Sequence, residues 1–313
     1  MSYQLQQHES LEEGLRRVAE EQIDKALAEI DDSKLSRHDT VHQVRKRCKK
    51  LRALARLVRS AFPEYQRFNT LYRDAARELS SIRDAQAVIE TFDDLLHHFD
   101  RQLDPGAFQP IRNELVARRD EAHAGVEAID RRIARVRDTI SSSRNDIEYW
   151  SLEADGGLIL GRGVKKTYRR AGKARAEAAD SPTTEAFHEW RKRIKYHWYH
   201  SRLLQRCWPA LIKPWASEMH RLSDMLGDEH DLAVLHTMLR KGPDRFADRK
   251  TLQAFSGLLE RRRAELRVDA FRLGALLQFE KPKHLGRRIR SYFDTPQSTN
   301  SALEAPAPRD VVA

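Results

Sequence analysis

One stretch of the chain stands out by the chemistry that its side chains can do. Residues 41–60, VHQVRKRCKKLRALARLVRS, hold eight Lys or Arg side chains and no acidic one. Ammonium and guanidinium groups bind phosphates, the first as a point charge and the second as a two-pronged fork. A solvated helix usually mixes both signs, because unlike charges at i,i+4 stabilise it and like charges repel. The run of one sign therefore predicts a polyanionic partner, with an ordinary charged surface as the alternative.

The same stretch is amphipathic when it is placed on a helix. At about 100° per residue, most of its basic side chains fall on one side and Val44, Leu51 and Leu54 on the other. This pattern predicts a helix with one face buried in a core and a cationic face turned towards a ligand. The candidate binding residues here are His42, Arg45, Lys46, Lys49, Lys50, Arg52 and Arg56.

The basic pattern recurs in the second half of the chain. FHEWRKRIK at 187–195 aligns with VHQVRKRCK at 41–49, at a shift of 146 residues and with the histidines in register. An ordinary charged surface has no reason to repeat in this way, so the repeat favours a site built from two related helices. The second set of candidates is His188, Arg191, Lys192, Lys195 and Arg202, aligned with His42, Arg45, Lys46, Lys49 and Arg56.

Two weaker similarities extend the repeat. LSSIRDAQAVI at 79–89 resembles LGDEHDLAVLH at 226–236, which pairs Asp84 with Asp231. Carboxylates repel phosphate, so we expect these two residues to orient basic side chains or cap helices rather than to catalyse. Arginine pairs recur at a shift of 144 residues. They add three candidates, for which ordinary surface charge is the alternative: Arg118, Arg119 and Arg262.

The two copies of the basic pattern differ in charge. Tyr196 and Trp198 stand where the first copy has Lys50 and Arg52, so the second cationic face is shorter. A basic helix over 162–173, just before the second copy, would compensate because its Lys and Arg residues follow one face. The site is therefore expected to be asymmetric. Its additional candidates are Lys165, Lys166 and Arg169.

Aromatic and histidine residues allow other interpretations. Aromatic side chains between 190 and 199 could stack nucleic-acid bases, although core packing is the simpler explanation for them. The histidine pairs at 97–98 and 197/200 lack the clustered carboxylate–histidine spacing of a metal site, so no metal is predicted.

Composition favours helix along the whole chain. The 313 residues are 33% charged and 40% hydrophobic, and 13 Gly and 11 Pro are few for this length. The formal net charge of +10 favours association with nucleic acid, an anionic membrane or another polyphosphate. We predict an all-α protein in which each half has about four helices, enough for a bundle with its own core.

Local signals predict where the helices begin and end. Ser10 and Glu13 form a capping box before a helix over 11–31, and Asp39 or Thr40 is expected to cap the basic helix. The basic helix is expected to end near Pro63. Further helices are predicted over 64–99 with a break near 80–81, then over 110–141, 163–179, 183–207, 215–240 and 244–266, with shorter ones to 292. Residues 294–313 are polar and rich in Pro, Ala and Ser, which predicts a disordered tail.

The cysteines and the first residues of the chain indicate the cellular compartment of the protein. Cys48 and Cys207 show no CxxC or Cys/His spacing, so neither a disulfide framework nor a structural zinc site is predicted, and no cofactor is expected. The first residues lack the basic-then-apolar pattern of a signal peptide. No apolar run reaches 18 residues, so no membrane insertion is expected. The sequence therefore predicts a cytoplasmic protein.

A histidine that opens a basic helix, repeated about 150 residues later, resembles the CHAD family, the conserved histidine α-helical domain. The resemblance rests on HQVRKRCKKLR, ELSSIRDAQAV, FHEWRKRIK and MLGDEHDLAV. It spans roughly residues 8–292, with repeats at about 8–145 and 155–292. It implies two four-helix bundles related by a pseudo-twofold axis, with a basic channel or groove between them. It also implies binding of inorganic polyphosphate and, in some members, association with storage granules.

Residues and resemblance together predict a non-catalytic protein that binds polyphosphate. His42 and His188 would donate to phosphate and charge beside it, or else hold the interface between the repeats. A nucleic-acid or nucleoid-associated binding protein is the first alternative. A polyphosphate-directed phosphohydrolase is the second, although the sequence has no Walker loop, no HExxH and no ExExK-type motif.

Overall fold

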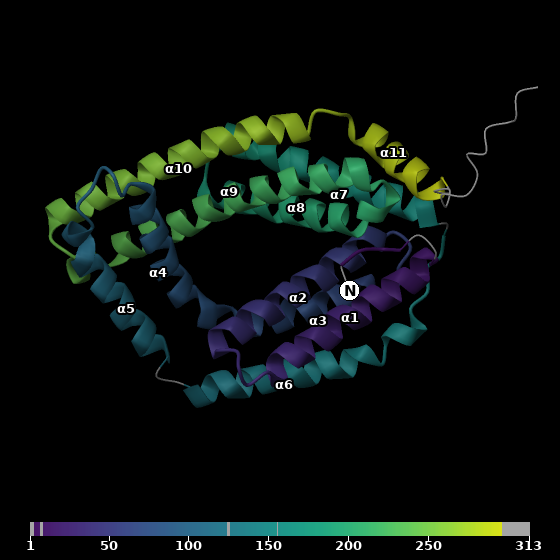
Figure 1. Ribbon diagram of the computed structural model, residues 1–313, viewed down its shortest axis with the longest axis horizontal. Helices are drawn as coiled ribbons and strands as arrows, with labels where there is room; N and C mark the ends of the chain where they lie inside the picture. Colours follow the sequence, from purple (N-terminus) through teal and green to yellow (C-terminus); the bar gives the residue numbers. More distant parts are fainter. Residues whose placement is uncertain (1–2, 7–8, 124–125, 155, 296–313) are drawn as a thin grey trace, which may run out of the picture.

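The computed structural model describes residues 3–6, 9–123, 126–154 and 156–295 (Figure 1). Within these residues the chain folds into eleven α-helices and four short 3₁₀ helices, without a strand. The all-α prediction is therefore confirmed. From residue 296 onward the predicted tail lies outside the described residues, and Asp294 closes the last helix.

The first half of the described chain begins with a cap that the sequence predicts. Ser10 Oγ accepts the Glu13 amide, and Glu13 Oε2 accepts the Ser10 amide at 2.8 Å. The basic helix starts earlier than predicted, because Ser36 caps it by accepting the Asp39 amide at 3.1 Å. The helices of this half are α1 (Leu11–Asp31), α2 (Arg37–Val58), α3 (Tyr65–Glu78), α4 (Ser80–His98), α5 (Gln109–His123) and α6 (Val126–Arg144).

The single helix predicted over 110–141 is two helices, because its ends are buried in different places. Ile111 and Leu115 of α5 lie in a hydrophobic cluster shared with α4 and with the helices of the second half. Val136 and Ile140 of α6 lie in the main core, where α6 packs on α1 and α3. As a result α5 and α6 diverge (Figure 1).

Three helices in the second half of the described chain are longer than predicted, whereas the helix predicted over 183–207 ends at Leu203. Thr183 caps the second basic helix by accepting the Ala186 amide at 3.2 Å. The next helix, predicted to begin at 215, begins at Pro209 and continues through Pro214. The helices are α7 (Gly156–Asp180), α8 (Thr184–Leu203), α9 (Pro209–Lys241), α10 (Arg249–Leu277) and α11 (Pro282–Asp294).

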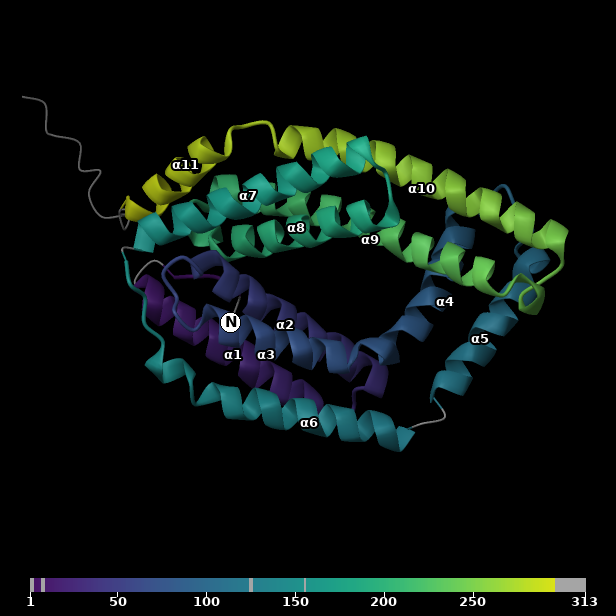
Figure 2. The same cartoon turned by 180° about the vertical axis from the view of Figure 1, so that it is seen from behind.

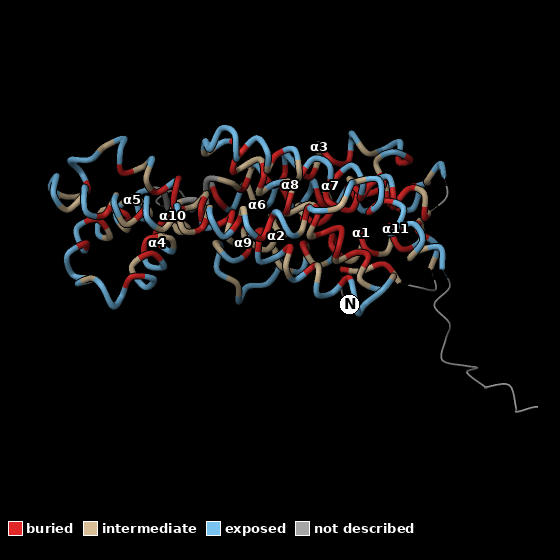
Figure 3. The backbone as a smooth tube through the Cα atoms, turned by 90° about the horizontal axis from the view of Figure 1, so that it is seen from above, coloured by how far each residue is buried: buried red, intermediate tan, exposed pale blue. Residues whose placement is uncertain are grey.

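The helices of the two halves lie side by side (Figures 1 and 2). Helices α1, α2, α3 and α6 lie on one side, and α7 to α11 on the other. α4 and α5 leave the first group and pack against α9 and α10 at one end. α2 contacts both α7 and α8, so the two basic helices are neighbours. Figure 3 shows the elongated outline, with buried turns along the inside of the body and exposed turns outside.

A glycine lets α2 and α7 touch backbone to backbone. A Cβ on Gly163 would stand 1.8 Å from the carbonyl oxygen of Leu57, at the end of α2. No side chain fits at that distance, so only glycine allows this approach. The contact fixes the second half of the chain against the first basic helix.

Residues 3–6, which we call the N-terminal strap, tie α2 to α8. The Tyr3 hydroxyl donates to the Lys50 carbonyl at 2.7 Å, and the Leu5 amide donates to the Leu203 carbonyl at 2.9 Å. Tyr3 and Leu5 are both buried. The strap therefore closes one side of the contact between the two basic helices.

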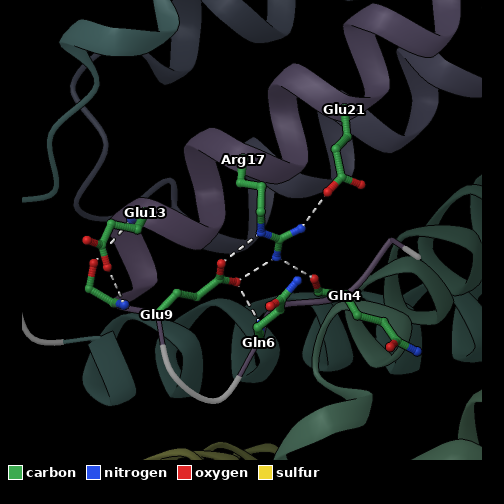
Figure 4. A network of polar contacts seen from close by, with 7 residues as sticks. Gln4, Gln6, Glu9, Glu13, Arg17 and Glu21 are labelled. Atoms are coloured by element: carbon green, nitrogen blue, oxygen red, sulfur yellow. Dashed lines mark hydrogen bonds and ion pairs between the residues drawn. The ribbon is translucent and has the colours of Figure 1, made fainter. Parts of the chain in front are cut away.

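Arg17 of α1 holds the strap in place (Figure 4). Its guanidinium donates to the Gln4 carbonyl at 2.9 Å and to both carboxylate oxygens of Glu9. A further bond reaches Glu21 at 2.8 Å, and the Gln6 amide donates to Glu9 at 2.7 Å. The hydrogen bonds to Glu9 are the main reason why the pKa of Arg17 is raised. The strap is thus anchored by charge-assisted bonds.

Candidate functional site

A cavity of about 360 Å³ lies between α2 and α8, next to α4 and α9. Six Lys or Arg side chains line it, three from each basic helix, and Asp231 is the only carboxylate among the described residues of the lining. Two histidines, two tyrosines and Ala87 complete the wall. We call this the cationic cavity, and its basic residues are Arg45, Lys49, Arg52, Arg191, Lys192 and Lys195.

Helical spacing brings these side chains together. The lining residues within 45–52 of α2 are three or four positions apart and therefore share one face, as do those within 188–195 of α8. On the opposite faces, Val44, Leu51 and Ile194 are buried in the hydrophobic core. Each basic helix is thus amphipathic in the sense that the sequence predicts.

Two arginines of α2 are held by neutral groups of α3. Arg45 Nη1 donates to the Ala76 carbonyl at 2.7 Å, and Arg52 Nε donates to Asn69 Oδ1 at 3.3 Å. Burial lowers the pKa of Arg52, and the neighbouring Arg56 adds to the lowering. A guanidinium that is already held loses less side-chain entropy when it binds an anion.

Asp231 on α9 is the counter-charge within the cavity. Its Oδ1 lies 3.5 Å from Arg191 Nη1, and both side chains are partly exposed. This contact agrees with the orienting role expected for Asp231. The side chain of Asp84, its counterpart in the repeat, lies outside the described part of the structure.

His188 and His230 pack against each other in a tilted arrangement in the cavity wall, with ring centroids 4.4 Å apart and planes at 42°. Burial lowers the pKa of His188 to about 4, and His230 and Lys192 add to the lowering. His188 is therefore neutral near pH 7 while the cavity holds no anion. Bound phosphate charge would act in the opposite direction and raise its pKa.

Three predicted binding residues of α2 and α8 that do not line the cavity are engaged with aromatic rings. Lys50 is buried beneath the strap, with Nζ 5.4 Å from the centroid of the Tyr3 ring. Burial is the main reason why its pKa falls to about 7. The guanidinium of Arg56 lies 4.5 Å from the Tyr196 ring, and that of Arg202 lies 5.9 Å from the Tyr3 ring. These three side chains stabilise the contact between α2 and α8 and do not line the cavity.

The repeat does not place equivalent residues symmetrically. His42 and Lys46 are half-buried on α2 and are not among the lining residues, whereas His188 and Lys192 are. Lys46 Nζ donates to Gln43 Oε1 at 3.4 Å. The predicted residues that the structure brings together in the cavity are Arg45, Lys49, Arg52, His188, Arg191, Lys192 and Lys195.

The basic face predicted on α7 lies outside the cavity lining. Lys165, Lys166 and Arg169 are exposed on α7. Burial lowers the pKa of Lys166, and Arg59 and Arg170 add to the lowering, so this group lies near the end of α2. A binding role for these three residues stays a prediction.

The arginine candidates of α5 and α10 have acidic partners. Arg118 Nε lies 2.8 Å from Glu114 Oε1, and Arg118 also covers the Phe246 ring at 4.3 Å. Arg119 pairs with Asp120 at 2.7 Å, and Arg262 pairs with Glu265 at 3.3 Å. None of the three is among the described residues that line the cationic cavity. Their place favours ordinary surface charge, and a binding role for them stays a prediction.

Sequence reasoning missed His230, Tyr196 and Tyr199 as lining residues. It assigned the tyrosines to core packing, yet both contribute to the cavity wall. The signal was present in the spacing, because 192, 195, 196 and 199 share one face of a helix. His230 precedes Asp231 in the aligned motif at 226–236, so the alignment also pointed towards it.

The comparison with known families identifies the chain. The family model for the CHAD domain matches residues 17–240, which is more than half of the sequence. The chain belongs to the CHAD-domain family. The match includes α2, α8 and every residue that lines the cationic cavity, and it confirms the resemblance carried by the four motifs. No curated protein matches this CHAD sequence.

The described residues of this CHAD protein contain neither a membrane-spanning helix nor a metal-binding cluster. None of its described helices has both the length and the apolar character needed to cross a membrane. Across the same residues, no three His, Cys, Asp or Glu side chains gather as a metal site requires.

Proposed function

We propose that this CHAD protein binds inorganic polyphosphate in the cationic cavity and catalyses no reaction there. The observation that carries the proposal is the convergence of six Lys and Arg side chains on a cavity whose described lining holds one carboxylate. Polyphosphate carries charge along its whole length and has no bases. Such a ligand is recognised through charge and hydrogen bonds alone, as the phosphate backbone of a nucleic acid is.

The side chains suit this ligand in two ways. The arginines offer forked donors to pairs of phosphate oxygens, and the lysines supply point charges between them. When the Lys and Arg side chains bind phosphates, they would also displace the counterions condensed on the polymer, so affinity should fall steeply with salt concentration. Both effects need several cations in a row, which the faces of α2 and α8 provide.

The proposal includes an origin by duplication. The two halves would be four-helix bundles related by a pseudo-twofold axis, with the cavity as part of a basic channel between them. The bounds of α2, shifted by 146 residues, give 183–204, close to α8 at Thr184–Leu203. Two aligned pairs, Arg45 with Arg191 and Lys49 with Lys195, contribute from both halves to one cavity. These agreements support a shared ancestry of the halves.

The proposal extends to the place of action. We expect a cytoplasmic protein that associates with polyphosphate storage granules through the cationic cavity. The basis is the CHAD membership together with the charge of the cavity. A tagged copy should lie on granules in cells, and a variant with Lys49→Glu and Lys195→Glu should lose that location.

Nucleic acid is the second candidate ligand, and one observation favours it. Tyr196 and Tyr199 line the cationic cavity, and tyrosine rings are side chains on which bases can stack. Single-stranded nucleic acid combines a charged backbone with stacking bases, so it would use both kinds of side chain. The tyrosines would contribute to binding of nucleic acid by stacking on its bases, but not to binding of polyphosphate, which has no bases.

Competition binding decides between these ligands. Labelled long-chain polyphosphate is bound at physiological salt and challenged with unlabelled polyphosphate, single-stranded RNA and duplex DNA. We expect only polyphosphate to compete well, since non-specific nucleic-acid binding is typically about 10⁻⁴ to 10⁻⁶ M under these conditions. Equal competition by RNA would show that the cationic cavity is a nucleic-acid binding site. Release of phosphate from the bound polymer in the presence of Mg²⁺ or Mn²⁺ would show an enzyme instead.

A further inference from the structure

A second cavity, of about 330 Å³, adjoins the cationic cavity on the side of α4. It lies between α4 and α9, with one residue from α10, and it shares Ala87 and Asp231 with the cationic cavity. Its described lining has four carboxylates, two histidines (His97 and His98) and one arginine, Arg262. We call it the acidic cleft, and its carboxylates are Glu90, Asp94, Asp228 and Asp231.

The sign of the charge therefore reverses at Asp231. On one side of this residue the described lining has six cations, and on the other it has three more carboxylates. Arg262 does little to balance them, because its guanidinium also pairs with Glu265 at 3.3 Å. Burial raises the pKa of Asp228, and the nearby carboxylates of Asp231 and Asp224 raise it further, while Arg262 and Arg191 lower it.

We propose that Asp231 and the carboxylates behind it end the polyphosphate path, so that a bound chain fills the cationic cavity but cannot continue between α4 and α9. This inference rests on the proposed function. It makes Asp231 a residue that sets the extent of the bound segment, in addition to its contact with Arg191. It also accounts for the position of Arg262, which lines the acidic cleft and not the cationic cavity.

Repulsion between the carboxylates of the acidic cleft and phosphate acts over a short range. At physiological salt the Debye length is about 8 Å, so carboxylates in the cleft are largely screened from phosphates deep in the cationic cavity. They repel only phosphates that approach them closely. A short chain that fits within the cationic cavity should hardly respond to the cleft, whereas a long chain that would otherwise extend across it should respond.

If Asp231 only orients Arg191, removing its charge should change polyphosphate affinity in the opposite direction. If its carboxylate serves only to position Arg191, removing the charge weakens binding of short and long chains alike. If it ends the path, removing the charge strengthens binding of long chains. Glu90 and Asp94 separate the two roles further, because they lie on α4, whereas the carboxylate that pairs with Arg191 is that of Asp231 on α9.

The experiment compares Asp231→Asn and the double variant Glu90→Gln/Asp94→Asn with wild type, using tripolyphosphate and long-chain polyphosphate. Asp269→Asn is the matched control, since Asp269 is an exposed carboxylate of α10 outside the cleft. For long chains we expect about five-fold tighter binding for each carboxylate removed, from the repulsion of two charges at 4 Å in water. The salt dependence should steepen, by about 0.7 in log–log slope if Arg262 neutralises one further phosphate. In the Glu90→Gln/Asp94→Asn variant, whose changes lie outside the cationic cavity lining, tripolyphosphate affinity should change less than about two-fold.

Three results would overturn the inference. Equal strengthening for both ligands in the Glu90→Gln/Asp94→Asn variant would show a general field effect. Weaker binding of both ligands to Asp231→Asn would show that orienting Arg191 is its role. Unchanged long-chain affinity in both variants would show that chains never reach the cleft. Failure of the wild-type protein to bind either ligand is a different outcome, which removes the proposed function itself.

Discussion

Lowering the pH should tighten polyphosphate binding through His188. In the empty cavity its pKa is about 4, because the ring is buried beside His230 and Lys192. Arg191 lowers it further, while Glu189 acts in the opposite sense. A phosphate chain along α2 and α8 brings negative charge to the ring and favours its protonated form. The bound state then holds more protons than the empty state, so affinity rises as pH falls.

The size of the effect follows from the two pKa values. If bound phosphate returns the pKa of His188 to its ordinary value of about 6.5, affinity rises about ten-fold between pH 7.5 and 5.5. The rise stops near pH 4, where the empty protein is protonated as well. His230 and Asp231 on α9, which line the same cavity, are left intact in this comparison.

Calorimetry in buffers of different ionisation enthalpy measures the proton uptake directly. Wild type should take up close to one proton near pH 5.5, and His188→Gln should take up fewer. His42→Gln is the matched control, because His42 does not line the cavity, and it should behave as wild type. The reasoning is refuted if wild type and His188→Gln show the same pH dependence, since the ligand's own titration is common to both.

Other predictions concern the helices that hold the cavity. Burial lowers the pKa of His197 to about 4 and that of His200 to about 3, so both take up protons when the chain unfolds. The free energy of unfolding should therefore fall by about 1 kcal/mol per pH unit for each histidine as pH drops from 6.5 towards 4, and chemical denaturation of His200→Gln should show a shallower fall. Gly163→Ala should destabilise the protein by about 1–3 kcal/mol through overpacking against Leu57. Gly257→Ala, with open space around it, should stabilise the helix by up to about 1 kcal/mol, and a melting curve that ranks the two variants the other way would contradict the account of the α2–α7 contact. Arg17→Gln should release the N-terminal strap and speed amide exchange at Leu5, and unchanged exchange there would show that Arg17 does not hold it.

Local signals predicted local structure well. The Ser10–Glu13 capping box forms as the sequence indicates, because both partners lie within four residues of each other. The amphipathic pattern of the two basic helices also placed their lining residues on one face. The predicted N-cap of α2, Asp39 or Thr40, was wrong by a few residues. Ser36 is also a good capping residue, and it caps the helix.

Long-range contacts explain what could not be predicted. Lys50 belongs to the cationic run by sequence, but Tyr3 covers it from 47 positions away along the chain. The separation of α5 from α6 depends on which distant helices bury each apolar face. The acidic cleft joins residues of α4 to residues of α9, and no periodicity within either helix indicates that they meet.

The most direct test of polyphosphate binding in the cationic cavity reverses two of its charges. Lys49→Glu/Lys195→Glu places one new carboxylate on each basic helix. Lys250→Glu/Lys283→Glu makes the same change of net charge at exposed positions outside the cavity. At physiological salt we predict that the first variant binds long-chain polyphosphate at least about 100-fold more weakly than wild type, while the second stays within about three-fold. Equal loss of affinity in both folded variants would contradict the account, because it would mean that net charge, and not this cavity, binds the polymer.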